Sequence, residues 1–258
     1  LSKKGKDAFE QGYHYSAASF CFGANVRYQE LLLKLQRIQN FAEIENEIRK
    51  FDAKFKDNRI KTITDLQAYM IVKERIKDAE DSIKRAKEAK DEGKNYTYEL
   101  GYSIERLYSA KSWSSFFDQD GKSFEFDKES LKDSCLKKIA EAEERYQYAS
   151  LYFPGTLKGT KKELDYAYED SERGDFELCL FKASKAKAES DIILSAIGIS
   201  DEQVKFVLEN KIDAVKNVIA KQQDKGIFPI LGYSYYEYAK SLKESSPFNA
   251  LLYTEYAL

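Results

Sequence analysis

The residue types that most often perform acid–base or metal chemistry are scarce in this sequence. Its 258 residues include a single histidine, His14. The residue three positions before it is Gln11, so the Glu-x-x-His pair of di-iron helical bundles cannot be built. We therefore interpret His14 as a polar residue at the start of a helix. The sequence predicts no catalytic residue, no cofactor and no metal ion.

The segment around Gly121 has a superficial likeness to two ligand-binding loops. Gly121 is followed by Lys and Ser, as in a phosphate-binding loop, but such a loop needs a second glycine where the chain has Phe116. A calcium loop would use nearby carboxylates, but Phe116 and Phe124 occupy two of its ligand positions and leave too few oxygen donors. The carboxylates in question are Asp118, Asp120 and Asp127. We interpret the segment as a turn.

The cysteines and the acidic side chains also favour structural roles over catalytic or metal-binding ones. Cys21, Cys135 and Cys179 include no Cys-x-x-Cys pair and cannot make a complete disulfide framework, so we expect buried, inert packing residues. Carboxylates of the Lys/Glu-rich stretches are expected on solvated helix faces, where lysines three or four residues away pair with them. Examples are Glu141, Glu143 and Glu144.

Four stretches place mostly small residues at offsets of five, nine and twelve from a turn-like position. These positions share one helical face, so each stretch offers a stripe that another helix can approach closely. Three stretches follow Gly12, Gly174 and Ser245, and a degenerate fourth follows Gly101 and contains Arg106. We expect each to be the second helix of a hairpin. The packing residues predicted are Ala17, Cys21, Ala24, Ala110, Trp113, Cys179, Ala183, Ala186, Ala250, Thr254 and Ala257.

Composition favours an all-α fold. The chain has only 3 Pro and 12 Gly, and 33% of its residues are charged, which suits the solvent faces of long amphipathic helices. We predict helical hairpins and long antiparallel helices that form a bundle or an irregular solenoid. The 42 basic and 44 acidic residues are interleaved, so no nucleic-acid partner is expected. No apolar run reaches the roughly 20 residues of a membrane span, so membrane contact would need segments outside this chain.

Helical periodicity and capping signals predict about ten helices within one domain, residues 1–258. Long helices are expected over about 25–55, 64–93 and 128–153. Thr160 and Ser200 match the capping-box spacing, so helices should start at residues 161 and 201, and Pro247 should open the last helix. Residues 118–127 carry Asp-Gly between aromatic pairs, which favours a tight turn or short hairpin and marks the best candidate for an internal boundary.

Tyrosine is unusually frequent, with 19 residues, and four of them gather near the C-terminal end. A tyrosine can bury its ring while its hydroxyl remains hydrated, so the cluster can fill a wide helix interface. It can equally line a groove that binds a protein or peptide partner, where tyrosine is favoured. The cluster consists of Tyr233, Tyr235, Tyr236 and Tyr238.

One stretch resembles the second helix of a tetratricopeptide (TPR) repeat. Residues 173–183, RGDFELCLFKA, have a glycine, an aromatic residue two positions on, and small or aromatic residues at the later offsets. The resemblance implies TPR-like hairpins and a scaffold that binds peptides or other domains. The first-helix signature and the 34-residue period of that family are missing.

The two ends of the chain resemble a second family. Residues 12–25, GYHYSAASFCFGAN, look like the start of the helical region after the protease domain of archaeal Lon-like (S16-type) serine peptidases, and residues 249–258, NALLYTEYAL, look like its end. The resemblance implies an upstream Ser-Lys domain and an exported, membrane-anchored protein; otherwise a cytoplasmic location is expected. None of those catalytic positions lies in this chain.

These resemblances and the lack of catalytic residues lead to one functional expectation. We expect a fragment of a longer chain, because it starts at Leu1 rather than Met and stops within a helical stretch. This fragment would be a non-catalytic protein-interaction domain, the C-terminal accessory region of a Lon-like peptidase. The alternative is an independent TPR-like adaptor or structural protein.

Overall fold

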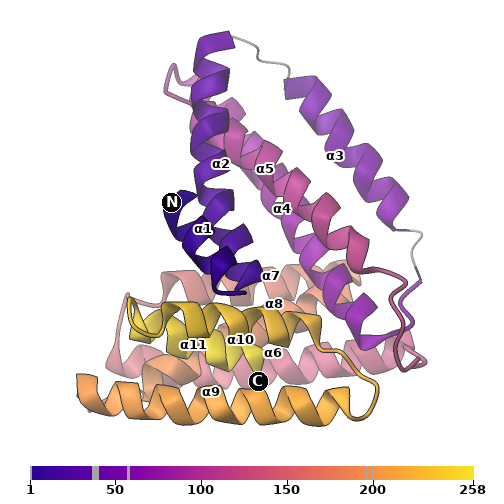
Figure 1. Ribbon diagram of the computed structural model, residues 1–258. Helices are drawn as coiled ribbons and strands as arrows, with labels where there is room; N and C mark the ends of the chain where they lie inside the picture. The colour runs from indigo at the N-terminus through magenta and orange to yellow at the C-terminus, as the bar shows by residue number, and fades with distance from the viewer. Residues whose placement is uncertain (1, 37–40, 57–58, 196, 199) are drawn as a thin grey trace. The chain divides into compact units, whose positions relative to one another are not determined.

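The computed structural model describes residues 2–36, 41–56, 59–195, 197–198 and 200–258. These residues form eleven α-helices and one 3-10 turn, with no strand among them, which confirms the all-α prediction (Figure 1). The chain divides into two compact units. Unit 1 comprises residues 1–60 and 68–119, and unit 2 comprises residues 61–67 and 120–258. The division after Gln119 falls within the segment 118–127.

The described residues of unit 1 include five α-helices, and four of these helices share an apolar cluster. Phe41, Ile83, Ala86 and Leu100 form the buried centre of this cluster, and Leu33 packs against it. The helices are α1 (Ser2–Glu10), α2 (His14–Gln36), α3 (Phe41–Phe55), α4 (Ile63–Asp91, in this unit from Ala68) and α5 (Thr97–Trp113). The single helix expected over 25–55 appears as α2 and α3, and residues 37–40 between them lie outside the described residues. The predicted 64–93 helix is α4, followed by a left-handed Gly93.

The fourth stripe led us to expect a helix that starts after Gly101. This expectation is wrong. Gly101 lies within α5, where the missing side chain lets α2 come close. A Cβ atom added at Gly101 would lie 3.2 Å from the backbone nitrogen of Glu30 and 3.3 Å from the backbone oxygen of Val26. This glycine is therefore explained by a helix crossing and not by a turn.

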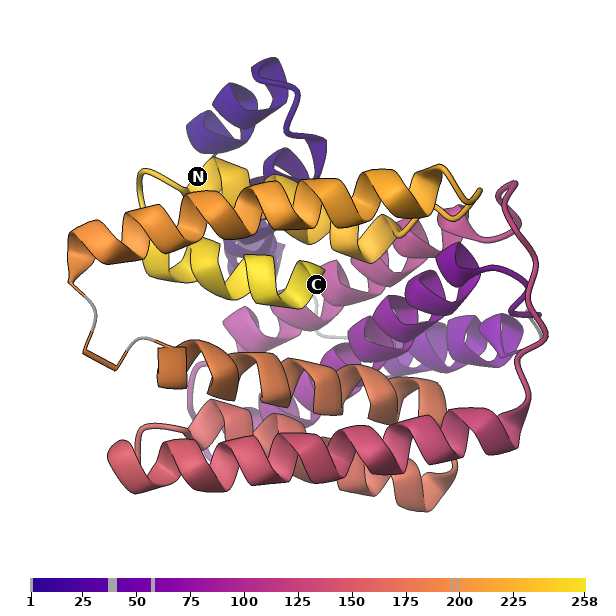
Figure 2. The ribbon, with the colours of Figure 1, turned by 90° about the horizontal axis from the view of Figure 1, so that it is seen from below.

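Unit 2 contains six helices, with α8 at its centre. They are α6 (Lys128–Tyr152), α7 (Lys158–Arg173), α8 (Phe176–Ser195), α9 (Asp201–Gln223), α10 (Ile230–Leu242) and α11 (Pro247–Ala257). Helices α6 and α7 lie on one side of α8, whereas α9 and α11 lie on the other (Figure 2). Among the described residues, one apolar cluster is shared by α6, α7 and α8, and another is shared by α8, α9 and α11.

Two of the three predicted helix starts in unit 2 are confirmed. Ser200 caps α9 with a reciprocal capping box to Gln203, and Pro247 is the first residue of α11. The third is wrong, because α7 begins at Lys158 rather than after Thr160. The Thr160 hydroxyl instead donates a hydrogen bond to the carboxylate of Glu189 on α8, at 2.8 Å.

The segment 118–127 forms no hairpin with itself, contrary to one of the two expectations for it. Its backbone pairs with other parts of unit 2: Ser123 forms an isolated antiparallel bridge with Thr62, and Phe124 donates a backbone hydrogen bond to Lys61, at 2.8 Å. Lys122 likewise donates to Gly226, at 2.9 Å. These longer-range partners satisfy the backbone groups that a hairpin would have paired internally.

The close approach at Gly101 yields a stability prediction. Replacing Gly101 with Val should lower the free energy of unfolding by about 1–3 kcal/mol, because the new side chain meets the α2 backbone. Urea denaturation measures the change. Gly159→Val is the matched control, since nothing lies within 4 Å of a Cβ added at that helical glycine. Equal stability of the two variants would contradict a close crossing of α2 and α5.

Candidate functional site

The small-residue stripes of unit 2 are buried between helices. Cys179, Ala183 and Ala186 on α8 are fully buried against α6 and α7. Ala250 and Thr254 on α11 are also fully buried, and Ala250 packs with Ile192 of α8 and Leu208 of α9. Three of the four stripes follow a helix-to-helix turn, at residues 11–13, 174–175 and 243–246. The stripes of α8 and α11 are therefore packing surfaces and not ligand sites.

In unit 1 the stripes differ from each other. Ala110 and Trp113 of α5 are buried, and the Trp113 ring meets Tyr15 of α2 edge to face, with centroids 6.1 Å apart. On α2, Ala17 is buried, Ala24 is half-buried and Cys21 is exposed. The stripe of α2 thus begins as a packing surface and becomes accessible along the helix.

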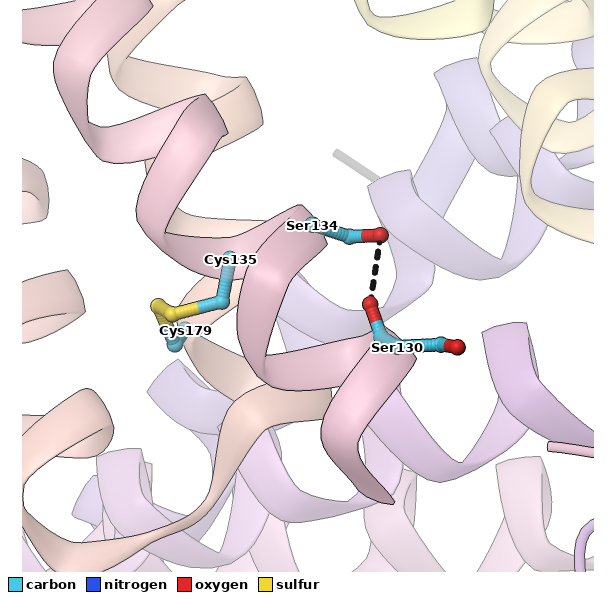
Figure 3. The surroundings of a disulfide bond; sticks show 4 residues. All are labelled: Ser130, Ser134, Cys135 and Cys179. Carbon is cyan, nitrogen blue, oxygen red and sulfur yellow. Dashed lines mark hydrogen bonds between the residues drawn. A yellow bond between two sulfur atoms is a disulfide. The ribbon is translucent and has the colours of Figure 1, made fainter. Parts of the chain in front are cut away.

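The cysteines depart from the expectation of three inert packing residues. Cys135 on α6 and Cys179 on α8, which are 44 residues apart in sequence, form a disulfide that joins the two helices (Figure 3). Both residues are fully buried, as expected, but they are covalently paired. Cys21 is a free and exposed thiol instead of a buried one. The spacing of three cysteines could not indicate the pairing, because the two partners meet only when α6 packs on α8.

The tyrosines proposed to bind a partner mainly hold α10 against α11. Tyr235 is buried and lies 5.7 Å and 5.4 Å, between ring centroids, from Tyr253 and Tyr256. Tyr238 meets Tyr253 edge to face at 4.6 Å. The two others remain more accessible: Tyr236 is half-buried beside Lys240, and Tyr233 is exposed beside Phe228. No continuous tyrosine face emerges from these four side chains.

A polar network that the sequence did not reveal connects α7, α8 and α11. Glu163 of α7 lies 3.1 Å from both Lys182 and Lys185 of α8. Glu189 of α8 accepts hydrogen bonds from Thr160 and, at 2.6 Å, from the hydroxyl of Tyr256 on α11. Burial, together with the nearby negative charge of Glu189, raises the pKa of Tyr256. These side chains form ion pairs and hydrogen bonds that join the three helices, as expected for buried polar groups.

Acidic residues of α6 are only partly the solvated pairs that we expected. Glu141 does pair with Lys138 three residues earlier, at 2.6 Å. Glu143 instead accepts a hydrogen bond from the Tyr168 hydroxyl of α7, which raises the pKa of Tyr168 to about 12. The hydroxyl therefore remains protonated at neutral pH and acts as a donor.

Asp170 is a buried carboxyl of α7 whose pKa is shifted toward neutrality. Burial raises the pKa of this carboxyl to about 6, although the guanidinium of Arg173, an ion-pair partner, opposes the shift. A pKa near neutrality is typical of an acid–base catalyst, but it also follows from burying a carboxyl at a helix interface. Asp170 lies in the last turn of α7, with Arg173 and the charge of Lys182 beside it. These neighbours indicate a structural ion pair.

The side chains with the clearest potential to bind a partner lie on α2. Tyr28, Leu31 and Leu35 are 63%, 57% and 80% exposed. They continue the spacing of the small residues before them, since positions 24, 28, 31 and 35 lie on one helical face. We call Ala24, Tyr28, Leu31 and Leu35 the α2 seam. A single exposed leucine is ordinary, but a row of large apolar side chains on one face indicates a contact surface.

Other kinds of site find no support in the described part of the chain. There, no group of three or more His, Cys, Asp or Glu side chains is arranged to hold a metal ion. No helix within the described ranges is both long and apolar enough to cross a membrane. No family model, curated protein or solved structure matches this chain. The α2 seam is therefore the candidate that the geometry favours.

The disulfide gives a prediction on stability. Reducing it should lower the free energy of unfolding by about 2–4 kcal/mol, because the reduced unfolded chain gains conformational freedom. Urea denaturation with and without dithiothreitol measures this loss. The Cys135→Ala/Cys179→Ala variant is the control and should not respond to the reductant. In the unfolded, unreduced protein only Cys21 should react with a thiol reagent, and reaction of all three cysteines would contradict the pairing.

Asp170 gives a prediction on pH dependence. Its pKa is higher in the folded protein than the usual 3.8, so the folded state binds the proton more tightly. Stability should therefore fall as the pH rises from about 4 to about 6, by up to about 3 kcal/mol. Denaturation curves across this range should show that Asp170→Asn removes the fall. Asp165→Asn changes an exposed carboxylate on the same helix and should leave it unchanged; an unchanged fall in Asp170→Asn would refute the assignment.

Proposed function

We propose that this chain is a non-catalytic helical domain that mediates protein contacts. The observation that carries this proposal is the α2 seam, where three large apolar side chains are more than half exposed. Fully covering one such side chain is worth about 1.5–3 kcal/mol, so a partner that covers all three gains several kcal/mol of hydrophobic free energy. The acidic and basic groups that might perform chemistry are paired within the fold, which supports a binding role over a catalytic one.

The hairpins support a TPR-like scaffold as the means of presenting this surface. Helices α1–α2, α7–α8 and α10–α11 are each joined by a short turn, and Gly174 closes α7 in a left-handed conformation. In helical-hairpin proteins, stacked helices hold an exposed helix face rigidly in place. We propose that α2 is displayed in this way.

The resemblance of the two chain ends supports a second, narrower proposal. In it, the domain is the C-terminal accessory region of a Lon-like serine peptidase, and its contacts serve that enzyme. The proposal rests on residues 12–25 and 249–258 alone, and it requires a Ser-Lys domain upstream in the complete gene product. Without that domain, the independent adaptor remains.

A photo-crosslinking experiment tests the contact function. A benzoylphenylalanine at position 31, in the protein expressed in its own cells, should crosslink to a partner protein that mass spectrometry identifies. The same group at Lys84, an exposed polar position of α4, should not. With the purified partner, Leu31→Glu should weaken binding by at least about tenfold, roughly 1.4 kcal/mol, because it places a charge in an apolar contact.

The matched variant is Leu151→Glu, which alters a leucine on α6 that is even more exposed than Leu31, at 76%. It should bind the partner as the unchanged protein does. If position 31 yields no partner, or if both glutamate variants bind equally well, the α2 seam is not a contact surface.

A further inference from the structure

We infer that the α2 seam binds an amphipathic helix that runs antiparallel to α2, in line with α1, and that carries acidic side chains on one flank. This inference rests on the proposed contact function and specifies the class of partner. It follows from the pairing of α1 with α2, from the spacing along α2 and from the charges beside the seam.

The first half of the same α2 face already pairs with a helix. A Cβ atom added at Gly5 of α1 would lie 2.7 Å from the Cys21 sulfur and 3.4 Å from the backbone oxygen of Ala17. Among the α1 residues whose burial is described, 3–10, Gly5 and Ala8 are buried. Helix α1 therefore lies directly on the face that contains Ala17 and Cys21, and the turn at residues 11–13 makes the two helices antiparallel.

The second half of that face extends beyond α1. Helix α1 has nine residues and α2 has 23, so their lengths are about 14 Å and about 35 Å. The helix pairing covers only the first part of α2 (Figure 1). Between Ala24 and Leu35 the seam runs for about 17 Å, or three helical turns. A helix of about twelve residues would continue the line of α1 over it.

The spacing of the face is that of a helix-pairing seam. Positions 17, 21, 24, 28, 31 and 35 alternate steps of four and three residues, which is the heptad pattern of a helix that packs lengthwise on another helix. The core face of α2 lies on the opposite side, where Val26 is buried and Gly101 of α5 meets the α2 backbone. The seam is therefore a second apolar face, in addition to the one that unit 1 needs for its own core.

Charges beside the seam favour an acidic partner. Arg27 and Lys34 lie along one flank, with 64% and 45% of their side chains exposed, and Glu30 pairs with both while being largely buried itself. One positive charge is left in excess on this flank. The other flank carries Asn25 and Leu32 and no charge. Flanking charges of this kind select the partner in helix pairs.

A second copy of this chain does not meet that requirement. If two copies of α2 paired in antiparallel orientation, Arg27 and Lys34 of one copy would face the same residues of the other. If they paired in parallel, the basic flank would face Asn25 and Leu32. Neither arrangement supplies a carboxylate, and the antiparallel one brings like charges together.

The direction of the partner helix follows from the positive charges in the first turn of α1. The first described turn of α1 contains Lys3 and Lys4, which are both exposed, and it has no acidic residue. A helix in line with α1 and running the same way places its C-terminal end, which is partly negative, next to these groups. The opposite direction would bring the partly positive end of the partner helix next to these lysines.

Binding of a synthetic helix tests the inference. The probe is a fluorescent peptide of about sixteen residues, with leucines at heptad positions and glutamates on the flank that faces Arg27 and Lys34. It is titrated with the complete chain while anisotropy is measured. Leu31→Glu and Leu35→Glu should each weaken binding by at least about tenfold, whereas Leu151→Glu should not. A peptide with lysines in place of the glutamates should bind at least about fivefold more weakly. Equal binding by Leu151→Glu and Leu35→Glu, or by both peptides, would overturn the inference.

Crosslinking tests the direction. In a Cys21→Ser background, Leu35→Cys should form a disulfide with a peptide that has cysteine at its N-terminal end, and not with one that has it at its C-terminal end. The reverse result would overturn the antiparallel arrangement. A dimer that Leu31→Glu converts to a monomer in analytical ultracentrifugation would identify a second copy as the occupant and would also overturn the inference.

The peptide and the crosslinking at position 31 separate the two proposals. If the peptide does not bind but position 31 still captures a partner, the helical class of the partner is wrong and the contact function stands. If position 31 captures nothing, the contact function fails, whatever the peptide does.

Discussion

The close approach of helices through small residues is the constraint on which this structure depends. Alanines on α8, fully buried, let α6 and α7 come near enough for Cys135 to bond to Cys179. The same proximity brings Glu163 within reach of Lys182 and Lys185. In unit 1, Gly101 has the corresponding role for α5 and α2. Larger side chains at these positions would separate the helices and break the bonds between them.

The same pattern on α2 changes its role along the helix. Ala17 is buried under α1, and Cys21 is exposed but lies beside Gly5 of α1; beyond them the face continues with Tyr28, Leu31 and Leu35, which are exposed. Small residues suit the part of the face that a short helix already covers. Large apolar residues suit a part that gains free energy when a partner covers it. One face of α2 thus contacts α1 along its first half and remains exposed along its second half.

Sequence patterns predicted local features well and contacts between distant segments poorly. The helical class, the Ser200 cap and the start of α11 at Pro247 follow from composition and short-range capping rules, so they could be predicted. The disulfide, the Glu189 network and the position of Gly101 depend on which helices meet, and spacing along one chain does not contain that information. The α2 seam could be recognised in the sequence as an apolar helical face, since the heptad spacing continues past Ala24. Without the fold, however, an exposed apolar face cannot be distinguished from one that is buried in the core.

Hydroxyl-radical footprinting of the isolated chain, with mass spectrometry of each residue, tests most directly whether α2 offers an open apolar face. We predict rapid oxidation of Tyr28, Leu31 and Leu35, at rates like that of the exposed Leu151, and strong protection of Tyr235 and Leu251. Protection of Leu31 and Leu35 in the monomeric protein would mean that the chain covers this face itself, which would contradict the account.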